Sequence, residues 1–270
     1  MNRPLVVLAA HTAALRGAPH LVELAAVRVV EGEAADPFES LVCPPVPVES
    51  EATSIHGIGE DDLRRAPMAA DVLERFAEWV GADRLAAHEA TTTAEVLGFE
   101  FARAGLPAPG GPWLDGSRLA AELLTDAPDH GLQALAEYLE LERGDFSGAL
   151  AQAVLCWKVL EECSERAAGQ DGAPASMADL LSRCGPPLTI ASRAPRRPHL
   201  ARRLRPLESA RLAQEPVTVL YGAGADAPAS VQFAPRFFFV RSGHDYLEAE
   251  CASSGLLKTY RLDRIRKVLT

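Results

Sequence analysis

Residues 5–17, LVVLAAHTAALRG, decide the fold, because an apolar run that ends in polar and small residues predicts a buried strand entering a turn. Residues 21–30, LVELAAVRVV, predict a second strand. Residues 31–33, Glu-Gly-Glu, predict a hairpin turn, and PFESLVCP after them predicts a third strand. The chain therefore opens on neighbouring strands of one sheet.

Helical spacing of apolar residues follows these strands. In residues 69–80 it gathers on one face Val72, Leu73, Phe76 and Val80. In residues 148–163 it predicts a long helix whose core-facing side chains are Leu150, Val154, Trp157 and Leu160. Strands first and alternating helices afterwards predict an α/β fold, a mixed sheet flanked by helices.

Composition narrows the class of protein. The 270 residues are 48% hydrophobic, and no run of about 18 apolar residues predicts a membrane span. No pair of cysteines has the CxxC spacing, which favours reduced thiols in a cytoplasmic protein over a disulfide frame or a zinc site. The five cysteines are Cys43, Cys156, Cys163, Cys184 and Cys251.

Charge divides the chain. Residues 1–165 hold 11 basic and 28 acidic side chains, a net charge of −17, whereas residues 166–270 hold 16 and 9, a net charge of +7. We expect a first domain at 1–165, then a linker at 166–206 with a short helix and the arginine-rich stretch RAPRRPHLARRLR. Short strands from residue 217 onward predict a small all-β domain at 207–270. The expected strands are VTVLY, SVQFAP, RFFFVRSG, DYLEAEC and LKTYRLDRIRKV.

The first domain carries a recognisable series of stretches. EATSIHGIGEDDL, LAAHEA, FARAGLP, WLDGSRLA, HGLQALAEYLEL and GALAQA follow one another in this order. Residues 5–163 thereby resemble the DEDDh family of 3′–5′ exonucleases, which has the ribonuclease H-like fold of proofreading polymerase subunits. The most specific matches are Thr53, Ile55, His56, Gly57 and Ile58.

The resemblance implies a catalytic site that this chain lacks. The family uses four carboxylates to hold two divalent metal ions and a histidine as general base. At the five matching positions this chain has Ala9, His11, Thr93, Ser147 and Gln152. Mg²⁺ needs charged oxygen ligands, so we expect no metal, no other cofactor and no two-metal hydrolysis. The interpretation leans away from an enzyme.

A rebuilt metal site stays open as an alternative. His11 and His88 could face each other across neighbouring strands, and two histidines with one acid suit zinc. Mg²⁺ or Mn²⁺ would then return as cofactors only if acids elsewhere replaced the missing ligands. The candidate acids are Glu89, Glu95, Asp115 and Asp145.

The C-terminal part supports a second resemblance. LESARLAQEPVTVLYGAG and FVRSGHDYLEAECASSGLLKTYRLDRIRKV resemble the WYL domain, a small SH3-like barrel of many bacterial regulators. The family tripeptide becomes Asp245-Tyr246-Leu247, without its Trp. This resemblance implies contact with a ligand or nucleic acid through cations and aromatic rings. The candidate residues, including the arginine-rich stretch, are Arg196, Arg197, Arg202, Arg203, Arg241, Tyr246, Lys258, Tyr260, Arg261 and Arg264.

Together these observations predict an inactive exonuclease homologue that binds single-stranded DNA, RNA or a nucleotide-like ligand in a regulatory role. Two alternatives remain. The first domain could instead dock on a protein partner such as a polymerase or a nuclease. A residual or rebuilt metal-dependent 3′–5′ exonuclease is the third hypothesis, and no membrane partner is expected.

Overall fold

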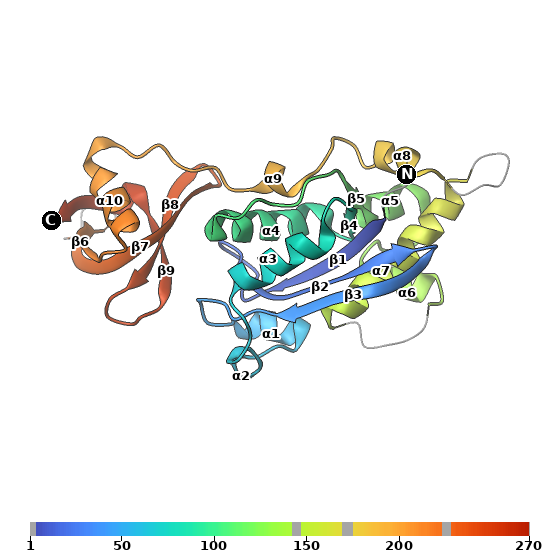
Figure 1. The fold of residues 1–270 in the computed structure, drawn as a ribbon, viewed down its shortest axis with the longest axis horizontal. Coiled ribbons are helices and arrows are strands. Elements are labelled where there is room, and N and C mark those ends of the chain that lie inside the picture. Colours follow the sequence, from blue (N-terminus) through green and yellow to red (C-terminus); the bar gives the residue numbers. More distant parts are fainter. Residues whose placement is uncertain (1–3, 142–146, 169–174, 223–227, 270) are drawn as a thin grey trace. The chain divides into compact units, whose positions relative to one another are not determined.

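The computed structural model describes residues 4–141, 147–168, 175–222 and 228–269. The chain divides into two compact units, Met1–Ala194 and Pro195–Thr270 (Figure 1). The division falls inside the segment 166–206 that the sequence assigns to a linker. Two helices of that segment, α8 (Met177–Arg183) and α9 (Ile190–Arg193), belong to the first unit.

A five-stranded mixed sheet forms the centre of the first unit, as predicted. Its strand order is β3-β2-β1-β4-β5, in which β1, β4 and β5 are parallel and β2 and β3 run antiparallel to their neighbours. Glu31 and Gly32 join β2 to β3 with φ of 53° and 88°, the positive values that a tight hairpin turn requires. The strands are β1 (Leu5–Thr12), β2 (Leu21–Val30), β3 (Glu33–Leu41), β4 (Arg84–Ala87) and β5 (Trp113–Asp115).

Successive side chains of β1 point to opposite faces of the sheet, so the core of the first unit has two layers. Val6 and Leu8 pack with α3 (Ala69–Val80) and α4 (Ala90–Ala104) on one face of the sheet. Leu5 and Val7 pack on the other face with α5 (Gly116–Leu123), α6 (Leu132–Tyr138) and α7 (Ala149–Arg166). Figure 1 shows this arrangement of helices about the sheet, together with the short α1 (Ser50–His56) and α2 (Glu60–Leu63).

The predicted helix at 69–80 is confirmed with its buried face, whereas the inward face predicted for α7 is partly wrong. Leu160 is buried, but Leu150, Val154 and Trp157 are only half-buried. Smaller side chains of α7 pack against the sheet instead, because α7 lies close to β1 and β2. These fully buried residues are Ala149, Ala153, Leu155, Cys156, Val159 and Cys163.

The second unit contains an antiparallel five-stranded sheet of order β10-β6-β7-β8-β9, which confirms the expected all-β region. Helix α10 (Arg205–Ala213) packs on it through the buried Leu207, and a 3-10 turn at Arg202–Leu204 precedes this helix. The strands are β6 (Val217–Tyr221), β7 (Ala229–Arg241), β8 (His244–Cys251), β9 (Leu257–Arg261) and β10 (Ile265–Leu269).

Two details of this sheet differ from the sequence prediction. SVQFAP and RFFFVRSG were expected to form separate strands, but both lie in β7, whose register shifts between Pro235 and Phe237. Proline is tolerated there because pairing with β6 has ended at Phe233. Conversely, LKTYRLDRIRKV is divided by a 3-10 turn at Leu262–Arg264. In the described part of the chain, no helix is long and apolar enough to cross a membrane.

Candidate functional site

A cleft of about 320 Å³ opens where β1 and β4 end. The two strands are parallel neighbours, so their C-terminal ends meet at one edge of the sheet, the usual place of a site in α/β folds. The lining comes from β1, from α1, from residues 88–93 at the start of α4, from the start of α6 and from α7. The fold therefore gathers into one cleft residues that lie far apart in the sequence.

Four of the five positions singled out by the exonuclease resemblance line this cleft. Ala9 and His11 come from β1, and Thr93 comes from the first turn of α4. Gln152 projects from the first turn of α7. Ser147 lies immediately before Gly148, the N-cap of α7, and is not among the residues that line the cleft.

His11 is held by a buried carboxylate that the sequence analysis missed. Its Nδ1 donates to Glu23 Oε2 at 2.8 Å, and its Nε2 lies 3.3 Å from Gln152 Oε1. Glu23 also accepts a 3.1 Å hydrogen bond from the backbone amide of Ala149. Burial by itself would raise the pKa of Glu23, but the His11 and Ala149 hydrogen bonds and the nearby imidazoles outweigh burial and lower it. Glu23 thus ties β1, β2 and α7 together beneath the cleft.

One feature of the sequence pointed to Glu23. It is the single charged residue within the otherwise apolar run LVELAAV, and a charge in a strand buried on both faces needs a partner. The register of β1 against β2 pairs His11 directly with Glu23. That register depends on the connection at residues 13–20, which no periodicity argument fixes.

His56 has a structural role beside His11. Their rings stack with centroids 5.2 Å apart at an angle of 22°. His56 Nε2 donates to the carbonyl of Thr12 at 3.3 Å, and its Nδ1 accepts from the amide of Ile58 at 3.1 Å. Burial and the neighbouring His11 lower the pKa of His56. A neutral ring with both nitrogens in use fixes the turn after α1 and is not free for chemistry.

His88 lines the same cleft, but its ring N–H is engaged by a backbone carbonyl. Its Nε2 donates to the carbonyl of His130 at 2.8 Å, and burial lowers the pKa of the ring. Among the described residues its buried Nδ1 has no hydrogen-bond partner. Asp115 lies at the N-terminus of α5 and accepts from the amide of Arg118 at 3.3 Å, so this carboxylate acts as a helix cap.

The donor set of the cleft is poor in charged oxygen. Glu89 is the sole carboxylate among the lining residues, and its backbone carbonyl accepts from the Thr93 hydroxyl at 3.1 Å. No group of three His, Cys, Asp or Glu side chains that could hold a metal ion occurs within the described ranges. Two acids of the rebuilt-site hypothesis remain: Glu95 is not among the residues that line the cleft, and Asp145 lies outside the described residues.

Comparison with known families assigns both parts of the chain. Residues 12–145 match the exonuclease family RNase_T, and residues 202–269 match the WYL domain family. The chain contains a DEDDh-type exonuclease domain and a C-terminal WYL domain. The exonuclease match ends just before α7, and the WYL match begins at the 3-10 turn that precedes α10.

Curated relatives of the exonuclease domain are bacterial polymerases. The PolC-type DNA polymerase III of Oceanobacillus iheyensis is 33% identical over 150 residues, which are 54% of this chain and 10% of the polymerase. The Bacillus subtilis enzyme of the same type is 30% identical over 151 residues. The chain therefore spans about a tenth of the length of the relatives it matches.

Solved structures support the fold. Exonuclease X, in complex with 5′-overhanging duplex DNA, is 24% identical with a TM-score of 0.50, and the match covers 66% of this chain and 99% of that one. Exonuclease I of E. coli, in complex with a dA16 oligonucleotide, is 12% identical with a TM-score of 0.54 and covers 92% of this chain and 55% of its own. Both carry the ribonuclease H-like fold, and at these identities the likeness concerns the fold alone.

Several candidate cations of the second unit are already paired. Arg197 lies 2.5 Å from Glu208, whose pKa is lowered to about 2 by hydrogen bonds from Arg211 and Arg197. Arg261 forms a two-pronged contact with Asp263, and Arg203 donates to the carbonyl of Ile265. These side chains brace the domain, which leaves fewer of their donors for a ligand.

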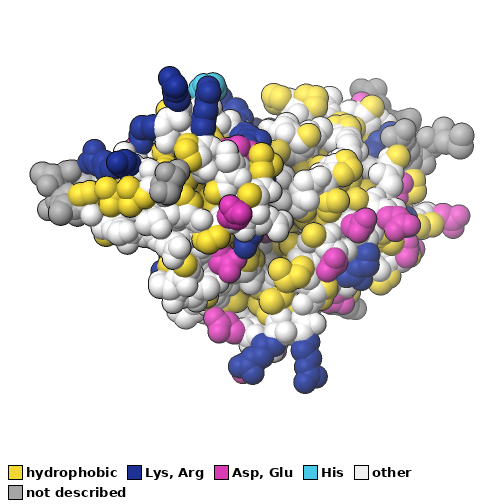
Figure 2. Space-filling view, turned by 60° about the vertical axis from the view of Figure 1, so that its left-hand side comes forward, with side chains coloured by type: hydrophobic (Ala, Val, Ile, Leu, Met, Phe, Trp, Pro, Cys, Tyr) yellow, Lys and Arg dark blue, Asp and Glu magenta, His cyan; other side chains and the backbone are white. Residues whose placement is uncertain are grey.

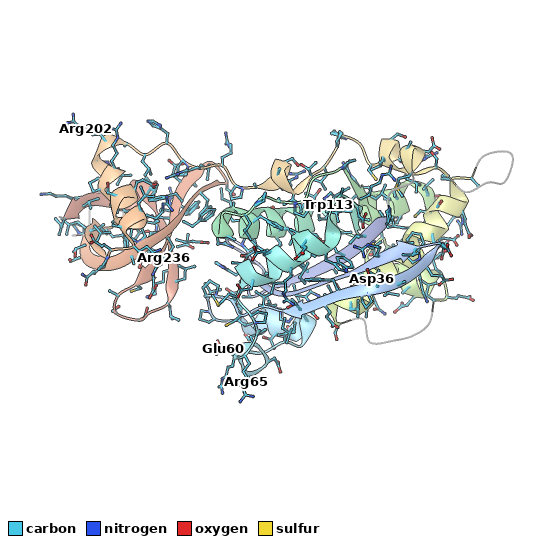
Figure 3. All side chains as sticks on the ribbon, in the orientation of Figure 1. Asp36, Glu60, Arg65, Trp113, Arg202 and Arg236 are labelled. Atoms are coloured by element: carbon cyan, nitrogen blue, oxygen red, sulfur yellow. The ribbon has the colours of Figure 1, made fainter. Side chains whose placement is uncertain are left out.

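Other cations of the second unit are exposed and form no salt bridge among the described residues. Arg196, Arg202, Lys258 and Arg264 form no salt bridge within the described chain. Figure 2 shows several Lys and Arg side chains projecting together with a histidine, and Figure 3 labels Arg202 on the turn before α10. Arg241 is half-buried and does not belong with this exposed set.

The two tyrosines predicted to stack on bases differ in exposure. Tyr260 is 7% exposed and packs in the core against Phe233 and Tyr221, so its ring offers no face to a base. The expectation for Tyr260 is wrong because strand alternation directs position 260 inward. Tyr246 is half-buried and stacks on Phe239 with centroids 5.2 Å apart.

Proposed function

We propose that this chain is a catalytically inactive homologue of 3′–5′ exonucleases that binds nucleic acid or a nucleotide-like ligand in a regulatory role. One observation carries the proposal. Ala9, His11, Thr93 and Gln152 share a single cleft, at the positions where the family resemblance implies four metal-binding carboxylates.

The chemistry of these side chains argues against a metal pair. Two Mg²⁺ ions need charged oxygen ligands to offset the loss of their water shells. Ala9 has no donor atom, Thr93 and Gln152 have only neutral ones, and His11 faces Glu23 and Gln152 within the protein. The residues present do not fit two Mg²⁺ or Mn²⁺ ions, and without the ions no water is activated for attack on a phosphodiester.

The limits of the family match support this proposal. The exonuclease match begins at residue 12 and ends at residue 145. Ala9 and His11 lie just before it, and Ser147 and Gln152 lie just after it. The stretches that would carry four of the five catalytic groups are thus the ones in which the likeness to the family stops, whereas the structural stretches between them are retained.

The WYL domain is the better candidate for contact with phosphates. Residues 1–165 carry a net charge of −17, which repels a polyanion, whereas residues 166–270 carry +7. Exposed arginines bind phosphate through a planar fork of donors. Exonuclease X and Exonuclease I, which are similar in fold, were each solved with DNA bound, and this supports the proposal of a nucleic-acid partner for this chain.

A nuclease assay tests the inactive cleft. The full chain is incubated with 5′-labelled single-stranded DNA and RNA in Mg²⁺ or Mn²⁺, with a chelator and an active 3′–5′ exonuclease as controls. We expect no shortening from the 3′ end under conditions in which the active enzyme digests the substrate. Chelator-sensitive shortening that disappears in Glu89→Gln would establish a rebuilt metal site and overturn the proposal.

Measurements of oligonucleotide binding at several salt concentrations distinguish the proposal from the hypothesis of a protein-docking scaffold. If the exonuclease domain serves only to dock on a protein, the purified chain will show no affinity for oligonucleotides at low salt. Binding to oligonucleotides that weakens steeply as salt rises supports the proposal instead, because released counterions drive such association.

A further inference from the structure

The first turn of α4 separates the cleft from a second cavity, of about 410 Å³, within the first unit. Thr92 and Thr93 line the cleft, whereas Thr91 lines the second cavity. The rest of its wall comes from the end of β5, the start of α5 and the segment that carries α9. None of the five catalytic positions of the family contributes to it, so this cavity is independent of the site described above.

The wall of the second cavity is fixed before any ligand binds. The amide of Trp113 donates to the carbonyl of Leu188 at 3.0 Å, and the amide of Asp115 donates to Cys184 Sγ at 3.3 Å. Arg118 Nη1 donates to the carbonyl of Cys184 at 2.6 Å. Gly98 of α4 admits the backbone of residues 193–194, because a Cβ there would lie 2.8 Å from the Ala194 nitrogen. A preorganised cavity binds a ligand at a lower entropic cost.

A buried donor in this wall has no partner. Trp113, labelled in Figure 3, is 1% exposed and lines the cavity. Its indole Nε1–H makes no hydrogen bond to any described residue. Because Trp113 lines the cavity, its indole N–H signal can report on a ligand bound there.

The charges around this donor favour an anion. Arg118 and Arg193 both line the cavity, and neither forms a salt bridge among the described residues. Asp115 is the single carboxylate of the wall, and it is occupied by the hydroxyl of Ser117 at 2.8 Å and by the amide of Arg118. The wall thus holds two cationic side chains and one carboxylate that is already hydrogen-bonded. The cavity is therefore positively charged, although the first unit as a whole is negative.

We propose that this second cavity binds a phosphate group, held by Arg118 and Arg193 beside the indole ring of Trp113. Phosphate suits the site because guanidinium forks match its oxygens and because it offers more acceptors and more charge than a carboxylate. The phosphate has two sources, a free nucleotide or inorganic phosphate and the backbone of a bound strand. The proposal concerns a metal-free site and goes beyond the function proposed for the cleft and the WYL domain.

The three tryptophans of the chain allow a direct test. The full chain is labelled with ¹⁵N-tryptophan, and the indole N–H signal of Trp113 is assigned with Trp113→Phe. The protein is then titrated separately with inorganic phosphate, with a short oligothymidylate and with acetate, all in the presence of a chelator. We expect phosphate or the oligonucleotide to move the Trp113 signal while the signals of Trp79 and Trp157 stay in place.

Arginine variants supply the matched control. Arg118→Gln and Arg193→Gln should each weaken the phosphate-dependent shift by about tenfold in apparent affinity, the effect of one lost charge-assisted contact. Arg183→Gln removes a nearby cation that is already paired with Glu122, and it should leave the titration unchanged.

The outcomes separate this site from the proposed function. A shift with phosphate alone identifies a small-molecule site, and a shift with the oligonucleotide alone identifies a strand contact. No Trp113 shift with either probe, an equal response to acetate, or an unchanged titration in both cavity variants overturns the proposal. Nuclease activity of the cleft would contradict the proposed function without affecting a shift of the Trp113 signal. Absence of a Trp113 shift would contradict the phosphate site without affecting the proposal that the cleft is inactive.

Discussion

Glu23 shows how a single side chain organises the cleft. Its carboxylate is 6% exposed, yet it is held ionised by the His11 ring and by the amide that starts α7. A negative charge near the N-terminus of a helix is also favoured by the helix dipole. His11, which the resemblance matches to a metal-ligand position of the family, is therefore the structural partner of a buried acid.

Replacing Glu23 with Gln should destabilise the protein by about 1–3 kcal/mol at neutral pH, because His11 and the Ala149 amide lose a charged acceptor. The pKa of Glu23 is lowered in the folded state, so its contribution is present above the ordinary value of 4.5 and is lost as pH falls below it. The difference between wild type and E23Q should therefore shrink on acidification. Urea unfolding at several pH values measures this change.

Glu39→Gln is the matched control for E23Q, because Glu39 is exposed on the neighbouring strand β3. It should change the urea midpoint little at any pH. A difference between wild type and E23Q that grows as the pH falls would contradict the assignment of Glu23 as an ionised buried partner of His11.

At the scale of elements, close approach between α4 and the segment carrying α9 shapes the first unit. Gly98 has no side chain where the backbone of Arg193 and Ala194 crosses the helix. Ile190, at the start of α9, is fully buried in the same layer as Leu97 and Trp113. Part of the segment that the sequence predicts to be a linker, including Ile190, is thus packed into the core of the first unit.

Gly98→Ala should displace this segment although alanine favours helix. The added methyl would meet backbone atoms at 2.8–3.0 Å, which are unable to move as a flexible side chain would. Overpacking of this kind costs about 1–3 kcal/mol. We expect a lower urea midpoint and faster hydrogen exchange of the Ile190 amide. Gly110→Ala, at a glycine with no neighbour within 4 Å, is the control, and equal effects of the two variants would refute the packing argument.

At the scale of the whole molecule, two-metal hydrolysis would require all five catalytic positions of the family together. They come from β1, from α4 and from the start of α7, and two metal ions require the complete charge set. Returning acids at Ala9 and His11 alone should restore no hydrolysis, because Thr93, Ser147 and Gln152 remain.

Returning Asp, Glu, Asp, His and Asp at the five positions in chain order should create affinity for Mn²⁺, measured by calorimetry on the full chain. Hydrolysis by the double variant A9D/H11E would show that the positions are wrongly matched. Absence of Mn²⁺ binding in a folded five-site variant would also contradict the matching.

Charge segregation is the other property of the whole molecule. Arg202→Gln removes an exposed cation without a salt bridge, and we expect it to weaken binding to labelled single-stranded DNA and to reduce the salt dependence by about one counterion. Arg236→Gln removes a cation that is paired with Glu250, and it should have the smaller effect. Fluorescence anisotropy at increasing salt measures both. Equal losses would argue against the unpaired arginines as the contact surface.

The sequence by itself determined the local features of this protein. It predicted β2 at residues 21–30 together with its hairpin turn, and the buried face of α3, because alternation and helical spacing are properties of neighbouring residues. Through the family resemblance, the sequence also predicts that the five catalytic positions are occupied by Ala9, His11, Thr93, Ser147 and Gln152. These identities do not depend on how the chain packs.

Only the tertiary structure decided which residues meet. The core face of α7 could not be read from its largest apolar residues, since the closeness of β1 and β2 selects small side chains such as Ala153 and Cys156. The pairing of His11 with Glu23 depends on strand register, and the cavity beside Trp113 depends on a segment more than 70 residues away along the chain. Contacts between distant residues arise from packing, and local periodicity carries no information about them.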